Sequence, residues 1–317
     1  MTGERKDVEH HPVLLDEALD ALRVMPCGLY VDGTFGRGGH SRAILERLGP
    51  KGRLFAFDRD PEAVMAAQSM AIDTRFSVSH ARFSQLSSVL KENAPDGVEG
   101  VLLDLGVSSP QLDHAERGFS FRNDGPLDMR MDPTSGVSAA AFIAHADERE
   151  IAQVLKAFGE ERFAKRIARA IVMARAQQAI ISTRQLALIV ASAVPKREPG
   201  IDPATRTFQA LRIQVNAELT EVASVLPQAL AALKQGGRLA VISFHSLEDR
   251  IVKQFIAGHS KPPAIPAGLA VREADRPKPC LKAIGKAIFA SDEEVARNPR
   301  SRSAVLRVAE RTGGVAS

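Results

Sequence analysis

The segment from Tyr30 to Ser41 constrains the fold more than any other, because it places an acid and four glycines where a strand gives way to a helix. The apolar residues 28–31 predict a short buried strand, and residues 41–48 have the apolar spacing of a helix. Glycines at such a turn let the backbone approach a ligand closely. The pattern is typical of a Rossmann-like sheet that holds a nucleoside cofactor.

Two acids end neighbouring predicted strands. Asp32 follows the first strand, and Asp58 ends the second, which covers residues 53–57. An acid at the tip of the second strand is the usual acceptor for the two hydroxyls of a ribose. Taken singly, each acid is also typical of a turn or a helix cap. The ordered pair with glycines between them favours a cofactor site.

The charge of Asp32 bears on which cofactor is bound. The best dinucleotide frame, Gly36-x-Gly38-x-x-Ser41, ends in serine where the fingerprint has glycine. A negative charge at Asp32 would repel a pyrophosphate but would suit a cation. S-adenosylmethionine has no phosphate and carries a sulfonium and an ammonium group, so the sequence favours this cofactor. A nicotinamide-dependent oxidoreductase on the same fold is the alternative.

The order of predicted elements indicates an α/β fold whose sheet is interrupted by a helical insertion. Short apolar runs predict strands at residues 29–31, 54–57, 76–78, 101–105, 237–244 and 303–309. Residues 113–135 are loop-like, and helical periodicity then continues to about Leu233. We therefore expect a first domain made of residues 1–112 and 216–317, and an inserted helical, substrate-recognising domain at 113–215. A single return helix is predicted by apolar residues at three- and four-residue spacing, namely Phe208, Leu211, Val215, Leu219, Val222 and Leu226.

The residues after Leu103 are expected to carry the chemistry, since ligands bind at the carboxyl ends of such strands. Residues 108–111, Ser-Ser-Pro-Gln, are related to the [DNS]-P-P-[YFW] turn of exocyclic-amine methyltransferases but lack its aromatic residue. Acceptors at this turn would draw the lone pair of the amine out of conjugation and direct it at the methyl group. A plain strand-ending turn is the alternative. The candidates beside the reacting amine are Asp104, Ser108, Ser109 and His245.

Composition excludes several other classes of protein. The eight histidines show no ligand spacing, so we expect no metal. Cys27 and Cys280 lie far apart, which indicates free thiols in a reducing compartment. The longest apolar run, residues 186–194, is too short to span a bilayer, and the first residues lack the apolar region of a signal peptide. We expect a cytoplasmic protein without a membrane partner.

A set of basic residues in the insertion suggests a polyanionic partner. The net charge is only +4, so any site for a polyanion must be local. By helical spacing, the basic side chains of 162–169 lie beside an apolar seam, and together they could follow an RNA backbone. A solvated helix face is the alternative. The predicted RNA contacts are Arg162, Lys165, Arg166, Arg169 and, further along the chain, Arg206.

Several long segments together make the chain resemble the RsmH (MraW) family of ribosomal RNA small-subunit methyltransferases. They run nearly from end to end, leaving out only the first nine or so residues and the extreme tail. The segments are 11–17 (HPVLLDE), 31–41 (VDGTFGRGGHS), 103–111 (LDLGVSSPQ), 117–121 (RGFSF), 125–131 (GPLDMRM), 203–210 (PATRTFQA), 243–250 (SFHSLEDR) and 298–300 (NPR).

The resemblance implies a class I S-adenosylmethionine-dependent methyltransferase fold with an inserted helical domain. The implied reaction is methylation of the exocyclic N(4) amine of one cytidine in small-subunit (16S) ribosomal RNA, near the decoding centre. The partner is either this RNA or the small ribosomal subunit, and a homodimer is left open. A catalytically silent RNA-binding assembly factor is a further alternative. The implied cofactor contacts, to which Asp32 is added from its position, are Gly38, Gly39, His40, Asp58, Phe83, Asp104 and Gln111.

Overall fold

A computed structural model describes residues 12–195, 199–262 and 278–314. The chain divides into two compact units. Residues 1–106 and 221–317 form one, which we call the sheet unit, and residues 107–220 form the other, the helical unit. The structure thus gives the helical unit a few more residues at each end than the predicted boundaries after residues 112 and 215.

The sheet unit contains a sheet of eight strands in the order β3-β2-β1-β4-β5-β8-β6, with β7 paired to β8. Strands β1 to β5 pair in parallel, and β8 runs antiparallel to β5. This arrangement confirms the predicted α/β fold of a class I methyltransferase. The strands are β1 (Leu29–Asp32), β2 (Arg53–Asp58), β3 (Phe76–His80), β4 (Val98–Asp104), β5 (Leu233–Ser243), β6 (Leu281–Ala283), β7 (Ile288–Phe289) and β8 (Val305–Arg311).

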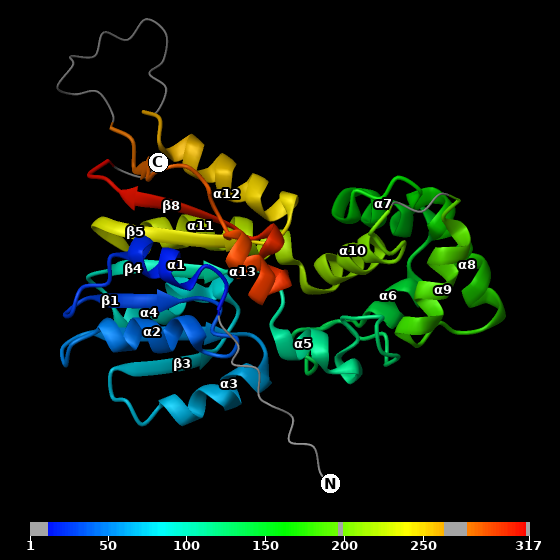
Figure 1. The fold of residues 1–317 in the computed structure, drawn as a ribbon, viewed down its shortest axis with the longest axis horizontal. Helices are drawn as coiled ribbons and strands as arrows, with labels where there is room; N and C mark the ends of the chain where they lie inside the picture. The colour runs from blue at the N-terminus through cyan, green and yellow to red at the C-terminus, as the bar shows by residue number, and fades with distance from the viewer. Residues whose placement is uncertain (1–11, 196–198, 263–277, 315–317) are drawn as a thin grey trace, which may run out of the picture. The chain divides into compact units, whose positions relative to one another are not determined.

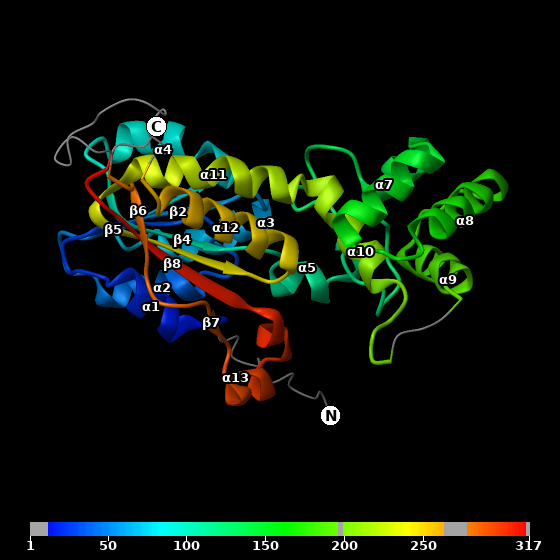
Figure 2. The same ribbon diagram turned by 90° about the horizontal axis from the view of Figure 1, so that it is seen from above.

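Helices cover both faces of this sheet, as its nearly continuous apolar strands require. Figure 2 shows α1 and α2 on one side of the sheet and α4 and α11 on the other. One core lies under α1 (Leu15–Leu22), α2 (Gly39–Arg47) and α3 (Pro61–Ala67). The other lies under α4 (Leu86–Asn93), α11 (Glu218–Ala232) and α12 (Ser246–His259), while α13 (Asp292–Arg297) precedes β8. The carboxyl ends of the parallel strands are thereby left to share one edge (Figure 1).

The helical unit has its own core, built mainly from α7, α8, α9 and α10. The side chains of Ser138, Asp147 and Ser182 accept hydrogen bonds from backbone N–H groups in the first turns of α6, α7 and α9. Such caps stabilise a helix because they satisfy N–H groups of its first turn that have no partner within the helix. The helices are α5 (Ser109–Asp113), α6 (Ala139–His145), α7 (Glu148–Gly159), α8 (Ala164–Gln177), α9 (Thr183–Ala193) and α10 (Thr205–Asn216).

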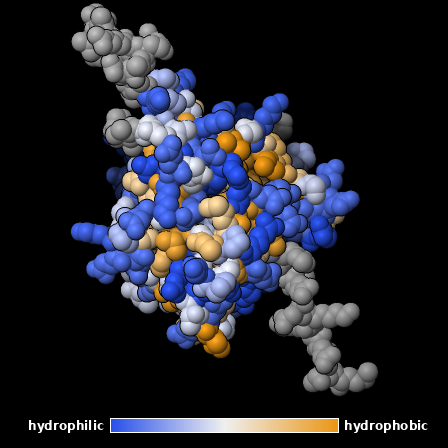
Figure 3. Space-filling view, turned by 90° about the vertical axis from the view of Figure 1, so that its left-hand side faces the viewer, coloured by the Kyte–Doolittle hydropathy of each residue, from blue (hydrophilic) through white to orange (hydrophobic). Residues whose placement is uncertain are grey.

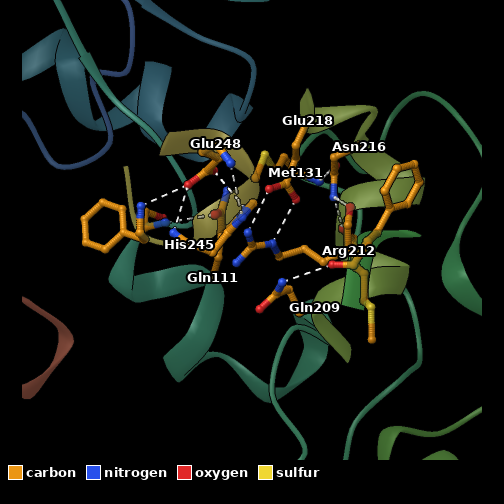
Figure 4. Close-up of polar contacts among 12 residues, drawn as sticks. Gln111, Met131, Gln209, Arg212, Asn216, Glu218, His245 and Glu248 are labelled. Carbon is orange, nitrogen blue, oxygen red and sulfur yellow. Dashed lines mark hydrogen bonds and ion pairs between the residues drawn. The ribbon is translucent and has the colours of Figure 1, made fainter. Parts of the chain in front are cut away.

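The prediction of one continuous return helix is wrong. The chain breaks at Ala217, which has φ 52° and separates α10 from α11. Asn216 stabilises the break, because its amide donates to Met129 O (2.7 Å) and accepts from Met131 N (2.9 Å), as Figure 4 shows for Asn216 and Met131. The apolar stripe is therefore divided: Phe208 and Leu211 lie in the helical core, and Val222 and Leu226 lie in the sheet core.

The strands predicted from the sequence are all present, with ends shifted by a few residues. β5 begins at Leu233, directly after α11 ends at Ala232, where the helical periodicity was expected to stop. The short strands β6 and β7 were not predicted.

On the face shown in Figure 3, hydrophilic side chains cover most of the surface, and hydrophobic ones lie in separate small groups. Among the helices in the described ranges, none combines the length and apolar character that crossing a bilayer requires.

Candidate functional site

Asp32 lies at the carboxyl end of β1 and is buried, with 1% of its surface exposed. Its carboxylate accepts from Ser41 Oγ (2.6 Å), at the start of α2, and from Thr34 N (3.1 Å). Burial raises the pKa of Asp32, and the bonds from Ser41 and Thr34 act in the opposite direction. Asp32 therefore holds both ends of the glycine turn through hydrogen bonds, and it contributes negative charge to this edge of the sheet.

Asp58, at the end of β2, holds two neighbouring turns together. One carboxylate oxygen accepts from Gly36 N and the other from Asp60 N, each at 2.8 Å. Burial raises the pKa of Asp58, these backbone bonds lower it, and the charges of Asp60 and Asp32 raise it; the net result is a pKa of about 6. The predicted ribose acceptor thus lies at the tip of the second strand, where the sequence placed it, with its carboxylate oriented by the glycine turn.

The glycines of the turn are needed for packing within the chain itself. Gly38 has φ +73°, and a Cβ there would lie 2.5 Å from the ring of Phe35. A Cβ on Gly39 would overlap the ring of Pro12. The expectation that these glycines serve the approach of a ligand is therefore only part of their explanation. They also let α2 begin against two rings of the chain.

His40 and Asp104 face one another on the same side of the sheet. His40 Nε2 lies 3.2 Å from Val13 O, and its Nδ1 lies 3.6 Å from Asp104 Oδ2. A carbonyl oxygen only accepts, so Nε2 carries the proton and Nδ1 presents its lone pair to Asp104. Burial lowers the pKa of His40 to about 4, and the bond to Val13 partly offsets this. His40 is therefore neutral, and its contact with Asp104 is not an ion pair.

Asp104 is the most unusual acid of the site. Its backbone N–H donates to Thr34 Oγ1 at 2.6 Å, but its Oδ1 is buried with no hydrogen-bond partner among the described residues. Burial raises the pKa of Asp104 well above its usual value, and the charges of Asp32 and Glu248 raise it further. An orphaned acceptor in a field of carboxylates is costly unless a donor or a cation meets it.

The residues at this edge of the sheet fit the predicted cofactor. Asp32 lies close enough to Asp58 and to Asp104 for its charge to raise the pKa values of both. A pyrophosphate would meet like charge here, whereas a sulfonium or an ammonium would meet opposite charge. Phe83, in the short helix that follows β3, is half-buried against the core beside Gly33. An aromatic ring at that position is suited to an adenine.

The predicted residues Ser108, Ser109 and Gln111 belong to the helical unit. Ser109 begins α5, and the buried Gln111 accepts from Ser108 N at 3.0 Å. This bond fixes the turn that leads away from Asp104 along the chain. The predicted site residues therefore belong to both units: Ser108, Ser109 and Gln111 to the helical unit, and the others near the cofactor to the sheet unit.

His245, at the start of α12, is held by Glu248 (Figure 4). Glu248 Oε2 accepts from Phe244 N (2.9 Å) and His245 N (3.3 Å), and its Oε1 lies 3.2 Å from His245 Nε2. The imidazole thus faces a buried carboxylate.

Three supporting residues of the site were not predicted: Thr34, Ser41 and Glu248. Glu248 has a recognisable signal, because an acid three residues after a helix cap forms part of a capping box. His245-Ser246-Leu247-Glu248 has this spacing with histidine at the cap position. Ser41 and Thr34 offer no such signal. Ser41 meets Asp32 only through the turn from β1 to α2, and Thr34 meets Asp104 only because β1 pairs with β4.

The basic residues predicted to contact RNA lie on the helical unit. Lys165, Arg166 and Arg169 are exposed on α8, whose buried face carries Ala164, Ile167, Ala168 and Ile171. Arg162 is exposed and lies just before this helix. Arg206 is half-buried in the first turn of α10. The predicted arrangement of a basic face beside an apolar seam is thus present, while the RNA contact itself stays a prediction.

Comparison with known proteins gives a consistent result. The MraW methylase family model matches residues 7–312. The chain is 62% identical to "Ribosomal RNA small subunit methyltransferase H" of Methylobacillus flagellatus over 305 residues, covering 96% of this chain and 95% of the relative. The proteins of that name from Chromobacterium violaceum and Neisseria gonorrhoeae are 59% and 58% identical, each covering 96% of this chain and 95% and 96% of the relatives. A putative rRNA-methylase structure from Clostridium thermocellum gives a TM-score of 0.45 at 12% identity, covering 95% of this chain and 99% of that one.

Proposed function

Because this chain belongs to the MraW methylase family, we propose that its substrate is small-subunit ribosomal RNA. The chain is an S-adenosylmethionine-dependent methyltransferase. The alternative of a nicotinamide-dependent oxidoreductase is therefore wrong. The RNA substrate is supported by relatives about 60% identical whose names state the small subunit. We further propose that the methyl group goes to the exocyclic N(4) amine of a cytidine near the decoding centre.

The observation that carries the proposed methyl transfer is the carboxylate of Asp104 at the end of β4, whose Oδ1 is buried without a hydrogen-bond partner among the described residues. The cofactor supplies a methyl group on a positively charged sulfur. Asp32 and Asp104 provide the negative charge that such a sulfur or the nearby ammonium requires, and Asp58 provides the acceptor for the ribose hydroxyls. Gly38, Gly39 and His40 shape the turn, Phe83 packs near the adenine, and Gln111 completes the set of proposed contacts.

Methyl transfer needs little acid or base catalysis, because the methylated amine is acidic and loses its proton afterwards. Positioning for in-line attack is then the main contribution of the protein. We propose that acceptors of the chain hold the hydrogens of the amine so that its lone pair points at the methyl group. The candidates are Asp104, Ser108, Ser109 and His245. The target cytidine has to leave its stack, at a cost of a few kcal/mol.

The test is transfer of a labelled methyl group to naked small-subunit RNA and to assembled small subunits, both taken from cells without the enzyme. Digestion and mass spectrometry then identify the product nucleoside. We expect N(4)-methylcytidine at one position, and its absence from both substrates would overturn the proposal. Cofactor binding without any transfer would instead support the silent assembly factor. For location we propose the cytoplasm, where small subunits are assembled.

A further inference from the structure

An open notch of about 550 Å³ lies at the turn from α7 to α8 in the helical unit. Lys156 and residues 160–166 line it. The end of α7 packs tightly on α10: a Cβ on Gly159 would lie 2.5 Å from Arg206 O, and Gln209 Nε2 donates to Phe158 O at 3.0 Å. The backbone of Arg206 therefore packs against the end of α7, and this packing fixes the turn that forms the notch.

The notch carries a surplus of positive charge. Lys156, Arg162, Lys165 and Arg166 are exposed, and within the described residues none of them forms an ion pair. Of the two acids that line the notch, Glu161 is only 6% exposed, and its carboxylate accepts from Phe163 N at 2.7 Å. Glu161 thus turns toward the backbone. Glu160 is the one exposed acid of the lining, against four exposed cations, so the exposed charge is mainly cationic.

The arrangement of the cations suits a nucleic acid. The guanidinium carbon of Arg162 lies 5.6 Å from the centre of the Phe163 ring, which holds the planar group in place. A guanidinium held in this way presents a fork of donors that matches the oxygens of a phosphate. Arg166 and Arg169, three residues apart on α8, extend the basic surface in a row along the helix. The alternative partner, an acidic segment of a protein, would require neither a guanidinium held by the Phe163 ring nor a row of cations along a helix.

We propose that this notch binds a phosphodiester of the RNA backbone, with Lys156, Arg162, Lys165 and Arg166 as the contacts. The proposal rests on the proposed RNA substrate and adds a binding site separate in the chain from the cofactor residues. Lys156 and Phe163 become part of the RNA-binding surface. The site contributes affinity for the RNA and takes no part in the transfer of the methyl group.

The test compares two variants of the full chain, each lacking two positive charges. K165A/R166A removes two cations of the notch, and R149A/R184A removes two exposed arginines of the same unit outside it. Binding to a fluorescent small-subunit RNA fragment is measured by anisotropy over a range of salt concentrations. Each lost phosphate contact lowers the salt slope by about 0.7 to 0.9. We expect a lower slope and an affinity about tenfold weaker for K165A/R166A only, with cofactor affinity and melting temperature unchanged in both variants.

Steady-state methylation separates this proposal from the proposed function. The notch variant is expected to raise KM for RNA while kcat at saturating RNA stays at the wild-type value. If the wild type methylates RNA and both variants keep the salt slope and the KM of the wild type, the notch proposal alone is overturned. If binding to naked RNA is unchanged but binding to assembled subunits weakens, a ribosomal protein occupies the notch, which also overturns it. Absence of methylation by the wild type counts against the proposed function instead.

Discussion

Cofactor binding is expected to weaken as the pH falls through about 6, because Asp58 must be ionised to accept hydrogen bonds from the ribose. Burial raises the pKa of Asp58, the N–H groups of Asp60 and Gly36 lower it, and nearby acids raise it, which together give a pKa of about 6. The carboxylate is the form that binds. Affinity is therefore complete above this pKa and is lost progressively below it.

The size of the effect follows from the pKa. For a single proton with a pKa of about 6, the Kd is about twofold higher at pH 6 and about elevenfold higher at pH 5 than at pH 8. Asp104 adds to this, because burial and the charges of Asp32 and Glu248 raise its pKa well above the usual value. If a cationic group of the ligand requires ionised Asp104, log Kd rises by more than one for each pH unit that the pH falls below both pKa values.

The measurement is isothermal titration calorimetry between pH 8 and pH 5, with circular dichroism at each pH to confirm that the protein is folded. Near pH 6, titrations in two buffers of different ionisation enthalpy count the protons released on binding. D58N should flatten the pH dependence, whereas D96N, which removes an exposed acid of the same unit, should keep it. A wild-type Kd that does not change between pH 8 and pH 5 would refute this reasoning.

Three other substitutions test the site and its support. Asp58→Ala should weaken cofactor binding by about 1 to 3 kcal/mol, if its carboxylate accepts from the ribose; unchanged affinity in calorimetry would show that the ribose lies elsewhere. Burial lowers the pKa of His40 to about 4, so its protonation in the unfolded chain should cost up to about 3 kcal/mol of stability as the pH falls from 6.5 to 4. Urea unfolding of wild type and H40N should diverge over this range, and parallel curves would contradict the burial of His40. Asn216→Ala removes two buried hydrogen bonds and should lower the free energy of unfolding by about 1 to 3 kcal/mol, measured by denaturant titration; a loss below about 0.5 kcal/mol would argue against this role for Asn216.

The sequence predicts those parts of the fold that depend on local pattern. The strands that end at Asp32, Asp58 and Asp104 are recognisable, because each is an apolar run closed by an acid or a glycine. Strands β6 and β7 have only three and two residues. Such short segments show no alternation, and pairing with β8 alone makes them strands.

The acids of the site could be predicted from the sequence, but the residues that contact and orient them could not. The position of Asp58 follows from the order of the strands, so its place at the cofactor edge could be expected. The contact between His40 and Asp104 depends on how α2 packs over the sheet, and Glu248 reaches the site only because α12 begins beside it. Likewise, the break at Ala217 depends on bonds from Asn216 to Met129 and Met131, far away in the sequence.

The break at Ala217 has a consequence for how this protein can vary over generations. Since the residues before and after it serve different cores, a substitution such as one at Leu211 is felt mainly by the helical unit, and one at Val222 mainly by the sheet unit. Changes at sites that share no contacts combine nearly additively. The helical unit, which carries the proposed RNA contacts, can therefore diverge between lineages while the core of the sheet unit is inherited unchanged.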